Sequence, residues 1–208
     1  MTSDSNDHNK STREAYHPLH LALIENAHSS TRLSSLVSTE LLKLPEGFFE
    51  GKKCADLGCG SGAFGAINLL QMGAKYVHAM DLDGSFIAPA QKSLSKDASF
   101  EGRWQTDIGS VDDLPYDDGF FDFILCQGVI MLTADDQKSV DEIARTLKPG
   151  GKAFVTVMGK GGLATRMMMD VFRDEYHNNP EFEHFVEHDL NPEWIGDQVD
   201  YLLSTLNP

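Results

Sequence analysis

Apolar positions in the middle of this 208-residue chain follow two different periods. Short apolar runs predict four strands, in KKCADLG, YVHAMD, FDFILCQG and KAFVTVMG, and EGRWQTD predicts a weaker strand, the third of five along the chain. Elsewhere in this region apolar residues recur three and four positions apart, which predicts helices in AFGAINLLQMG, SFIAPAQKSL and ADDQKSVDEIARTL. We expect Ser85 to cap the second of these helices and Thr133 the third, which KPGG then ends.

This alternation of strands and helices predicts an α/β fold. The expected architecture is a Rossmann-like, doubly wound and mostly parallel sheet with helices on both faces. Ligands of such sheets bind beyond the carboxyl ends of the strands. The loops that follow the strands are therefore the first place to look for chemistry.

The chain on either side of this core has a different character. Residues 1–14 are polar without an apolar anchor, which predicts a disordered tail. Residues 15–50 predict an N-terminal helical cap, with apolar residues four apart at Leu19, Leu23 and Ala27 and again at Leu33, Val37 and Leu41. The core is expected over residues 51–160. Residues 161–208 read as an acidic, helical C-terminal region.

Charge and cysteine content narrow the function classes. The net charge is −15, and residues 170–208 hold ten acids and one base. Such a surface repels phosphate backbones, so we expect no nucleic-acid partner, and a solvated acidic face is favoured over a site for a cationic substrate. The chain has no apolar run of membrane-spanning length and no secretion signal at its start. Three cysteines without CxxC spacing add to the expectation of a soluble, cytoplasmic protein with free thiols.

The stretch CADLGCGSGAFG, residues 54–65, contains two overlapping nucleotide fingerprints. In the dinucleotide pattern G-x-G-x-x-G, Gly60 would come first, and Asp56 and Gly58 would fall at the end of the strand, where they fit poorly. In the other register Gly58 turns the chain directly after the strand. Gly60 and Gly62 then let the backbone approach a ligand closely.

Acids end the next two strands. Asp81 ends the second strand, where a carboxylate can accept both hydroxyls of a ribose, a role common to several nucleotide cofactors. Asp107 ends the third strand, where a carboxylate can accept the amino group of an adenine while Ile108 packs on the ring.

Together with LPYDDGFFD before the fourth strand and LKPGG before the fifth, these motifs resemble the class I S-adenosylmethionine-dependent methyltransferases, especially the branch acting on small molecules. The resemblance covers roughly residues 52–158. It implies S-adenosylmethionine as cofactor and S-adenosylhomocysteine as product. It also implies a cofactor site formed by Asp56, Gly58, Cys59, Gly60 and Gly62 at the methionine end, Asp81 and Leu82 at the ribose, Asp107 and Ile108 at the adenine, and Gln127 after the fourth strand.

The resemblance implies methyl transfer to a small-molecule acceptor, a reaction that proximity alone can drive. Candidates for a base or a substrate contact are Tyr16, His17, His20 and His28, although histidines of a half-exposed helix are the more ordinary interpretation. Many relatives carry a histidine after the fourth strand. This chain has Met131, Leu132 and Thr133 there, which favours an apolar substrate wall.

The C-terminal region departs from the family pattern. The family sheet usually ends with two further strands, whereas residues after Gly162 read as helical, so these strands are expected to be missing or replaced by helices. A homodimer could protect the open edge. His184 and His188 are four apart near His177, but an acidic surface helix is the favoured interpretation, and we predict no metal.

Three other functions stay open. A catalytically inactive cofactor-binding subunit that stabilises or regulates a partner is favoured by the incomplete sheet and the missing histidine. Aminopropyl transfer on the same fold usually needs an acid after the fourth strand, which Gln127 and Gly128 do not supply. An enzyme that uses NAD is the third alternative.

Overall fold

A computed structural model describes residues 8–14, 16–17, 20–21, 37–157 and 163–185, with the backbone alone for 163–170. The chain divides into two compact units, Met1–Val157 and Met158–Pro208. Each unit is described by itself below.

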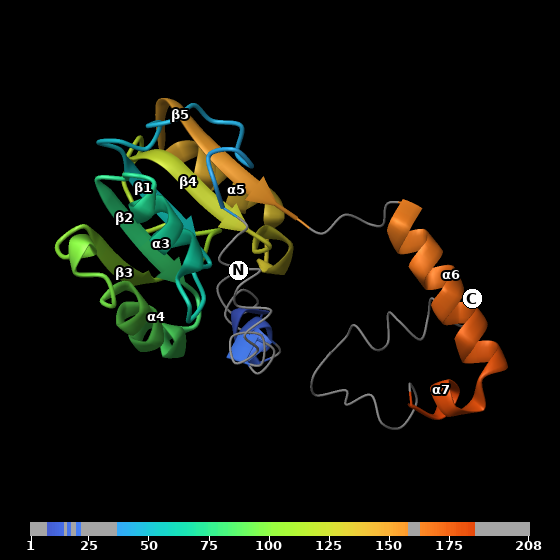
Figure 1. Ribbon diagram of the computed structural model, residues 1–208. Helices are drawn as coiled ribbons and strands as arrows, with labels where there is room; N and C mark the ends of the chain where they lie inside the picture. The colour runs from blue at the N-terminus through green and yellow to red at the C-terminus, as the bar shows by residue number, and fades with distance from the viewer. Residues whose placement is uncertain (1–7, 15, 18–19, 22–36, 158–162, 186–208) are drawn as a thin grey trace. The chain divides into compact units, whose positions relative to one another are not determined.

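The first unit is built on a sheet of five parallel strands (Figure 1). The strands are β1 (Lys53–Leu57), β2 (Tyr76–Asp81), β3 (Trp104–Ile108), β4 (Phe121–Gln127) and β5 (Leu147–Thr156). Their order across the sheet is β3-β2-β1-β4-β5, so the chain reverses its direction of travel between β3 and β4. This order confirms the predicted Rossmann-like fold and places the switch point between β1 and β4.

Three helices connect the strands. α3 (Phe64–Gln71) follows β1, α4 (Ile87–Leu94) follows β2, and α5 (Asp136–Thr146) follows β4. Short 3-10 helices occupy η1 (Gly84–Phe86), η2 (Ala98–Phe100) and η3 (Ile130–Leu132). Figure 1 shows α3 and α4 on one face of the sheet and α5 on the other.

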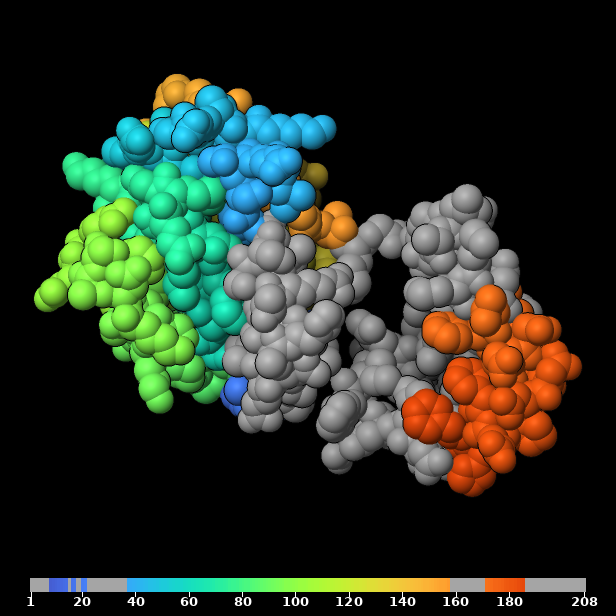
Figure 2. Space-filling view, viewed as in Figure 1, coloured from blue at the N-terminus to red at the C-terminus, as the bar shows by residue number. Residues whose placement is uncertain are grey.

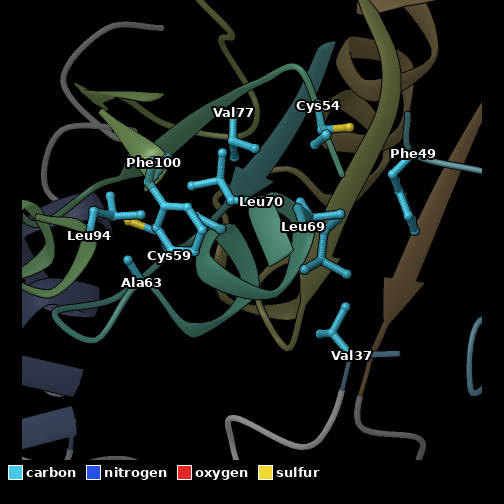
Figure 3. Close-up of a cluster of buried hydrophobic side chains, with 14 of the residues drawn as sticks. Val37, Phe49, Cys54, Cys59, Ala63, Leu69, Leu70, Val77, Leu94 and Phe100 are labelled. Carbon is cyan, nitrogen blue, oxygen red and sulfur yellow. The ribbon is translucent and has the colours of Figure 1, made fainter. Parts of the chain in front are cut away.

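Alternate residues of the strands feed two separate hydrophobic cores. On β1, Cys54 belongs to the core under α3 and α4, whereas Ala55 belongs to the core under α5. On β4, Leu125 likewise belongs to the core under α3 and α4, and Ile124 to the core under α5. Figure 3 shows the first core, where the side chains of Leu70, Leu94 and Phe100 gather close to Cys59 of the glycine loop. Burial on both faces explains why the inner strands β1, β2 and β4 are largely apolar in sequence.

The predicted helix caps were wrong by a few residues. Ser85 lies inside η1, and the cap of η1 is Asp83, whose carboxylate accepts the N–H of Ser85. The cap of α5 is Asp135, whose carboxylate accepts the N–H of Lys138. The hydroxyl of Thr133 instead donates to the carbonyl of Ile130. In both cases an aspartate carboxylate holds the capping position in place of a hydroxyl.

β5 begins earlier than the sequence predicted. KPGG ends α5 as expected, but these four residues already belong to β5, which starts at Leu147, the partner of Phe121 on β4. The pairing with β4 is irregular between Phe121 and Phe123. Pro149 has no N–H to donate and Gly150 has a φ of +79°, so this part of the strand cannot form a regular ladder.

The segment before the core also differs from expectation. Residues 8–14, predicted as a disordered tail, are helical, because they gain hydrogen bonds to the core that a local pattern cannot reveal. Residues 37–50, predicted as part of a helical cap, form turns. Val37 and Phe49 bury their side chains in the first core, and Figure 2 shows this segment in light blue at the surface of the unit. Residues 22–36 lie outside the described part.

The described part of the second unit is helical. It contains α6 (Leu163–Asn178) and α7 (Pro180–His184), which Asn179 caps by accepting the N–H groups of Glu181 and Phe182. Across the described ranges, no helix combines the length and the apolar character needed to cross a membrane.

Candidate cofactor site

A cavity of about 450 Å³ lies at the carboxyl ends of the central strands. Its walls come from Gly58–Gly60 after β1, Asp81–Asp83 after β2, Gly109–Val111 after β3 and Gln127–Val129 after β4. This volume is within the range of small-molecule and cofactor sites, and its position at the switch point is the one expected for this kind of sheet.

The backbone conformation and the close packing of the loop after β1 require glycine at two positions. Gly58 has a φ of +78° and Gly60 a φ of +58°, a region that favours glycine. A side chain at Gly58 would collide with Val129, and one at Gly60 would collide with the imidazole of His20. These glycines therefore let the side chains of Val129 and His20, which also line the cavity, pack directly on the backbone of the loop.

Asp56, at the end of β1, is a buried carboxylate beside the cavity. Its Oδ2 accepts the N–H of Ala66 in the first turn of α3 at 2.7 Å. A Cβ at Gly65 would lie 2.6 Å from its Oδ1, so this glycine makes room for the acid. Burial raises the pKa of Asp56 from its ordinary value of 3.8 to about 7, against the lowering effect of the Ala66 hydrogen bond.

Asp81, at the end of β2, links the two loops that flank it. Its Oδ2 accepts the N–H of Gly60 at 2.8 Å, and its Oδ1 accepts the N–H of Asp83 at 2.9 Å. Burial raises the pKa of this carboxyl despite these hydrogen bonds. Each carboxylate oxygen keeps acceptor capacity for a hydroxyl donor in the cavity.

Seven of the ten predicted cofactor residues line the cavity: Asp56, Gly58, Cys59, Gly60, Asp81, Leu82 and Gln127. Gly62, Asp107 and Ile108 are not among the lining residues. Gly62 instead makes room for the ring of Phe64, which does line the cavity. Ile108 is 64% exposed and lies next to Gly84.

Asp107 has other partners. Its Oδ2 accepts the hydroxyl of Tyr116 at 2.9 Å and faces Nδ1 of the buried His78 at 3.1 Å, and both its oxygens accept from Gln105. Burial lowers the pKa of His78, although the bond to Asp107 opposes this effect. The Asp107 carboxylate therefore links β3 to β2, through His78, and to Tyr116 in the loop after β3. Residues Gly109–Val111 of this loop, and not Asp107, line the cavity.

The N-terminal helical segment, defined here as residues 8–14, 16–17 and 20–21, forms the remaining wall. Near its start, His8 Nε2 lies 3.1 Å and Thr12 Oγ1 3.2 Å from the carbonyl oxygen of Leu132, in the loop after β4. Of the three residues predicted as an apolar substrate wall, Leu132 and Thr133 line the cavity there and Met131 is not among its lining residues.

Near its end, the segment contacts the loops after β1 and β2. His17 Nδ1 lies 2.7 Å from Asp83 Oδ2, and the His17 ring stacks on Phe86. His20 Nε2 accepts the N–H of Ser61 at 2.9 Å. Burial lowers the pKa of His20 and the neighbouring His17 lowers it further, while Asp83 raises it, so a neutral His20 with its proton on Nδ1 fits this arrangement.

The structure thus brings three of the four candidate catalytic residues, Tyr16, His17 and His20, to the cavity. His28 lies outside the described residues, as does His188 of the alternative metal site. No group of three metal-ligating side chains occurs within the ranges that the structure describes.

Comparison with known proteins agrees with this geometry. The sequence profile of a family described as a methyltransferase domain matches residues 55–155. Phosphoethanolamine N-methyltransferase 2 of Caenorhabditis elegans is 29% identical over 114 residues, which are 55% of this chain and 25% of that protein. A ubiquinone biosynthesis O-methyltransferase of Xanthomonas oryzae pv. oryzae is 31% identical over 113 residues, 53% of this chain and 44% of that protein. A tRNA U34 carboxymethyltransferase of Campylobacter curvus is 27% identical over 139 residues, 65% of this chain and 44% of that protein.

Solved structures share the fold. The cyclase SpnF superposes with a TM-score of 0.58 at 22% identity, over 74% of this chain and 60% of that chain. A candidate S-adenosyl-L-methionine-dependent methyltransferase from Methanococcus maripaludis superposes with a TM-score of 0.54 at 21% identity, over 100% of this chain and 86% of that chain.

The chain spans less than half the length of the curated relatives named above. The family profile, over residues 55–155, covers most of the sheet, the glycine loop and the acids at the strand ends. On the family match, these relatives and the fold, the chain belongs to the class I S-adenosylmethionine-dependent methyltransferases, whose cofactor is S-adenosylmethionine.

Proposed function

We propose that this protein transfers the methyl group of S-adenosylmethionine to a small-molecule acceptor. The observation that carries the proposal is the cavity at the switch point of the sheet, where the glycine loop and Asp81 meet the N-terminal helical segment. A methyl group bound to a sulfonium sulfur is already activated for attack. The acceptor atom takes this methyl group as the carbon–sulfur bond breaks, and S-adenosylhomocysteine is the product.

The residues present fit this cofactor. Gly58 and Gly60 line the cavity, and their positive φ angles shape the loop that would hold the methionine end of the cofactor. Asp81 would accept the ribose hydroxyls and would orient the nucleoside. Gly109–Val111, after β3, would flank the base. Gln127 would face the reacting end of the cofactor, as the family resemblance implies.

The chain's own residues would act mainly by orientation and by exclusion of water. The lone pair of His20 Nε2 is already taken by the N–H of Ser61. His17 faces Asp83, next to the proposed ribose contact, which favours a role in closing the cavity over a role as base. The proposal therefore requires no general base from these two histidines.

Two features favour a small acceptor. The N-terminal helical segment forms one wall of the cavity, which leaves room for a compact molecule. The net charge of −15 opposes a nucleic-acid substrate, although one relative is a tRNA carboxymethyltransferase. The names of the ubiquinone and phosphoethanolamine methyltransferases are consistent with a small acceptor without identifying it. A homodimer stays a prediction.

Calorimetric titration of S-adenosylmethionine and S-adenosylhomocysteine into the purified chain tests the proposal. We expect saturable binding that falls at least tenfold in Asp81→Ala. Asp97→Ala is a matched control, since Asp97 is an exposed acid that caps η2 without lining the cavity. Absence of binding at millimolar cofactor contradicts the proposal. Binding of both ligands without S-adenosylhomocysteine release from any acceptor would favour the inactive, partner-regulating subunit.

A further inference from the structure

One face of the N-terminal helical segment lines the cavity with polar side chains only. The lining residues are Asn9, Thr12, Arg13, Tyr16, His17 and His20. Their spacing of three and four positions is that of a single helix face, so the side chains of neighbours in this set lie close together. An apolar face would be the ordinary choice if the segment only covered the core.

These six side chains fall into two groups. Thr12, His17 and His20 form the hydrogen bonds that attach the segment to the core. Asn9, Arg13 and Tyr16 form no hydrogen bond or ion pair with the residues that the structure describes. The three occupy positions i, i+4 and i+7, so they form a line of polar side chains along the cavity wall that has no partner among the described residues.

Asn9 gives the clearest sign of an absent ligand. Its Oδ1 is fully buried and has no hydrogen-bond partner in the described structure. A buried carbonyl without a donor is destabilising, and native proteins rarely leave one unpaired. A ligand that brings an O–H or N–H group to this oxygen would satisfy it.

Arg13 adds a charge preference. The acids in the cavity wall are Asp56, Asp81 and Asp83, and Arg13 is the one lysine or arginine among its described lining residues. The net charge of −15 repels anions, so an anionic ligand needs a positively charged side chain at its binding site. The guanidinium group is suited to carboxylates, which it binds with two parallel hydrogen bonds.

We propose that Asn9, Arg13 and Tyr16 form the acceptor subsite, and that the acceptor is a small carboxylate with a hydroxyl or amino donor next to it. Arg13 binds the carboxylate, Asn9 Oδ1 accepts from the donor, and Tyr16 closes the wall between the cavity and solvent. The inference rests on the proposed methyl transfer and specifies its substrate class.

The test is an acceptor panel of small hydroxy- and aminocarboxylates, each paired with its primary amide, in an assay of S-adenosylhomocysteine release. We expect acids to be methylated with kcat/KM at least tenfold above their amides. Arg13→Gln should remove this preference, and Asn9→Leu should lower kcat/KM for the acids at least fivefold without lowering Tm. Lys10→Gln is the control, since Lys10 pairs with Glu14 and does not line the cavity.

Arg13 could instead bind the carboxylate of the cofactor itself. The Kd of S-adenosylhomocysteine is therefore measured for each variant, together with that of 5′-methylthioadenosine, which lacks the amino-acid end of the cofactor. We expect both to stay within twofold of wild type in Arg13→Gln. A loss confined to S-adenosylhomocysteine overturns the acceptor assignment. Equal turnover of acids and amides, or turnover of no acid, also overturns it. A wild-type protein that does not bind S-adenosylhomocysteine contradicts the proposed methyl transfer rather than this subsite.

Discussion

The imidazole of His20 lies directly over the α-carbon of Gly60. Its Nε2 accepts the N–H of the next residue, Ser61, at 2.9 Å, and a side chain at Gly60 would occupy the space of the ring. Gly60 also donates its own N–H to Asp81. The tip of the glycine loop is therefore fixed from the N-terminal helical segment on one side and from β2 on the other.

Gly60→Ala should weaken S-adenosylhomocysteine binding at least tenfold. The φ of +58° costs a non-glycine residue about 1–2 kcal/mol, and the new methyl group must also displace His20. Isothermal titration measures the loss. Gly102→Ala is the matched control, because Gly102 has a φ of +72° with no atom near its missing side chain.

The control variant, Gly102→Ala, should lose stability while its affinity for S-adenosylhomocysteine stays at the wild-type value. His20→Ala in the Gly60→Ala background removes the collision and should restore part of the binding. If both glycine variants bind S-adenosylhomocysteine like wild type, the close packing of His20 on the loop does not matter for the cofactor.

Asp56→Asn should change how stability depends on pH. The folded state holds the Asp56 proton up to a pKa of about 7, whereas the ordinary value is 3.8. Between these values the folded state binds more protons than the unfolded chain, so this group makes wild-type stability fall as pH rises from about 4 to about 7. The asparagine variant lacks this loss, and its free energy of unfolding should rise relative to wild type between pH 5 and pH 7.5.

Urea denaturation at several pH values measures this difference. Asp97→Asn serves as the control, since hydrogen bonds from Ser99 lower the pKa of exposed Asp97 and move its titration below this window. Parallel stability curves for Asp56→Asn and wild type would show that Asp56 is ionised throughout.

Tyr116→Phe should destabilise the fold by about 1–3 kcal/mol, because it leaves the Asp107 carboxylate without one of its donors. Burial and the charge of Asp107 raise the pKa of Tyr116, so the hydroxyl keeps its proton and donates. The comparison is Tyr76→Phe, whose exposed hydroxyl donates to Gln105 at 3.3 Å and should matter little. Equal free energies of unfolding for Tyr116→Phe and Tyr76→Phe in urea would contradict a structural role for the hydrogen bond between Asp107 and Tyr116.

The inner strands β1, β2 and β4 were predictable because they are buried on both faces. β2 has the predicted bounds, Tyr76–Asp81, and all five predicted segments formed strands. The helix of residues 8–14 was not predictable, since its stability depends on bonds to Leu132, far away in the sequence. Residues 37–50 show the converse: Val37 and Leu41 have a helical spacing of four, yet the segment forms turns in which Val37 is buried and Leu41 is exposed.

The sequence predicted the cavity position of residues that directly follow or end a strand. Gly58 and Gly60, after β1, and Asp81, at the end of β2, line the cavity, and the resemblance had assigned all three to the cofactor site. Asp107 also ends a strand, yet its carboxylate bonds Tyr116 and lies among the buried polar and aromatic side chains around His78. The spacing of Asn9, Arg13 and Tyr16 was visible in the sequence, but only the structure shows that they share a cavity wall and have no partner within the part of the chain that it describes.

Arg145→Lys should weaken both the fold and the cofactor site. The guanidinium group of Arg145 donates to the carbonyls of Leu114 and Tyr116 and to Glu142, so it holds the loop that begins with Gly109–Val111. A lysine ammonium cannot reach these acceptors together. We expect a loss of about 1–3 kcal/mol in the free energy of unfolding. Displacement of the loop should also raise the Kd of S-adenosylhomocysteine several-fold.

Arg103→Lys separates these two effects. Arg103 makes a similar fork, to the carbonyls of Leu70 at 3.1 Å and Ala74 at 2.6 Å, but neither Arg103 nor these two residues line the cavity. It should lose comparable stability while its Kd stays at the wild-type value. If Arg145→Lys also keeps the wild-type Kd, then the loop after β3 does not hold the nucleoside, and the adenine end of the cofactor must be bound elsewhere in the cavity.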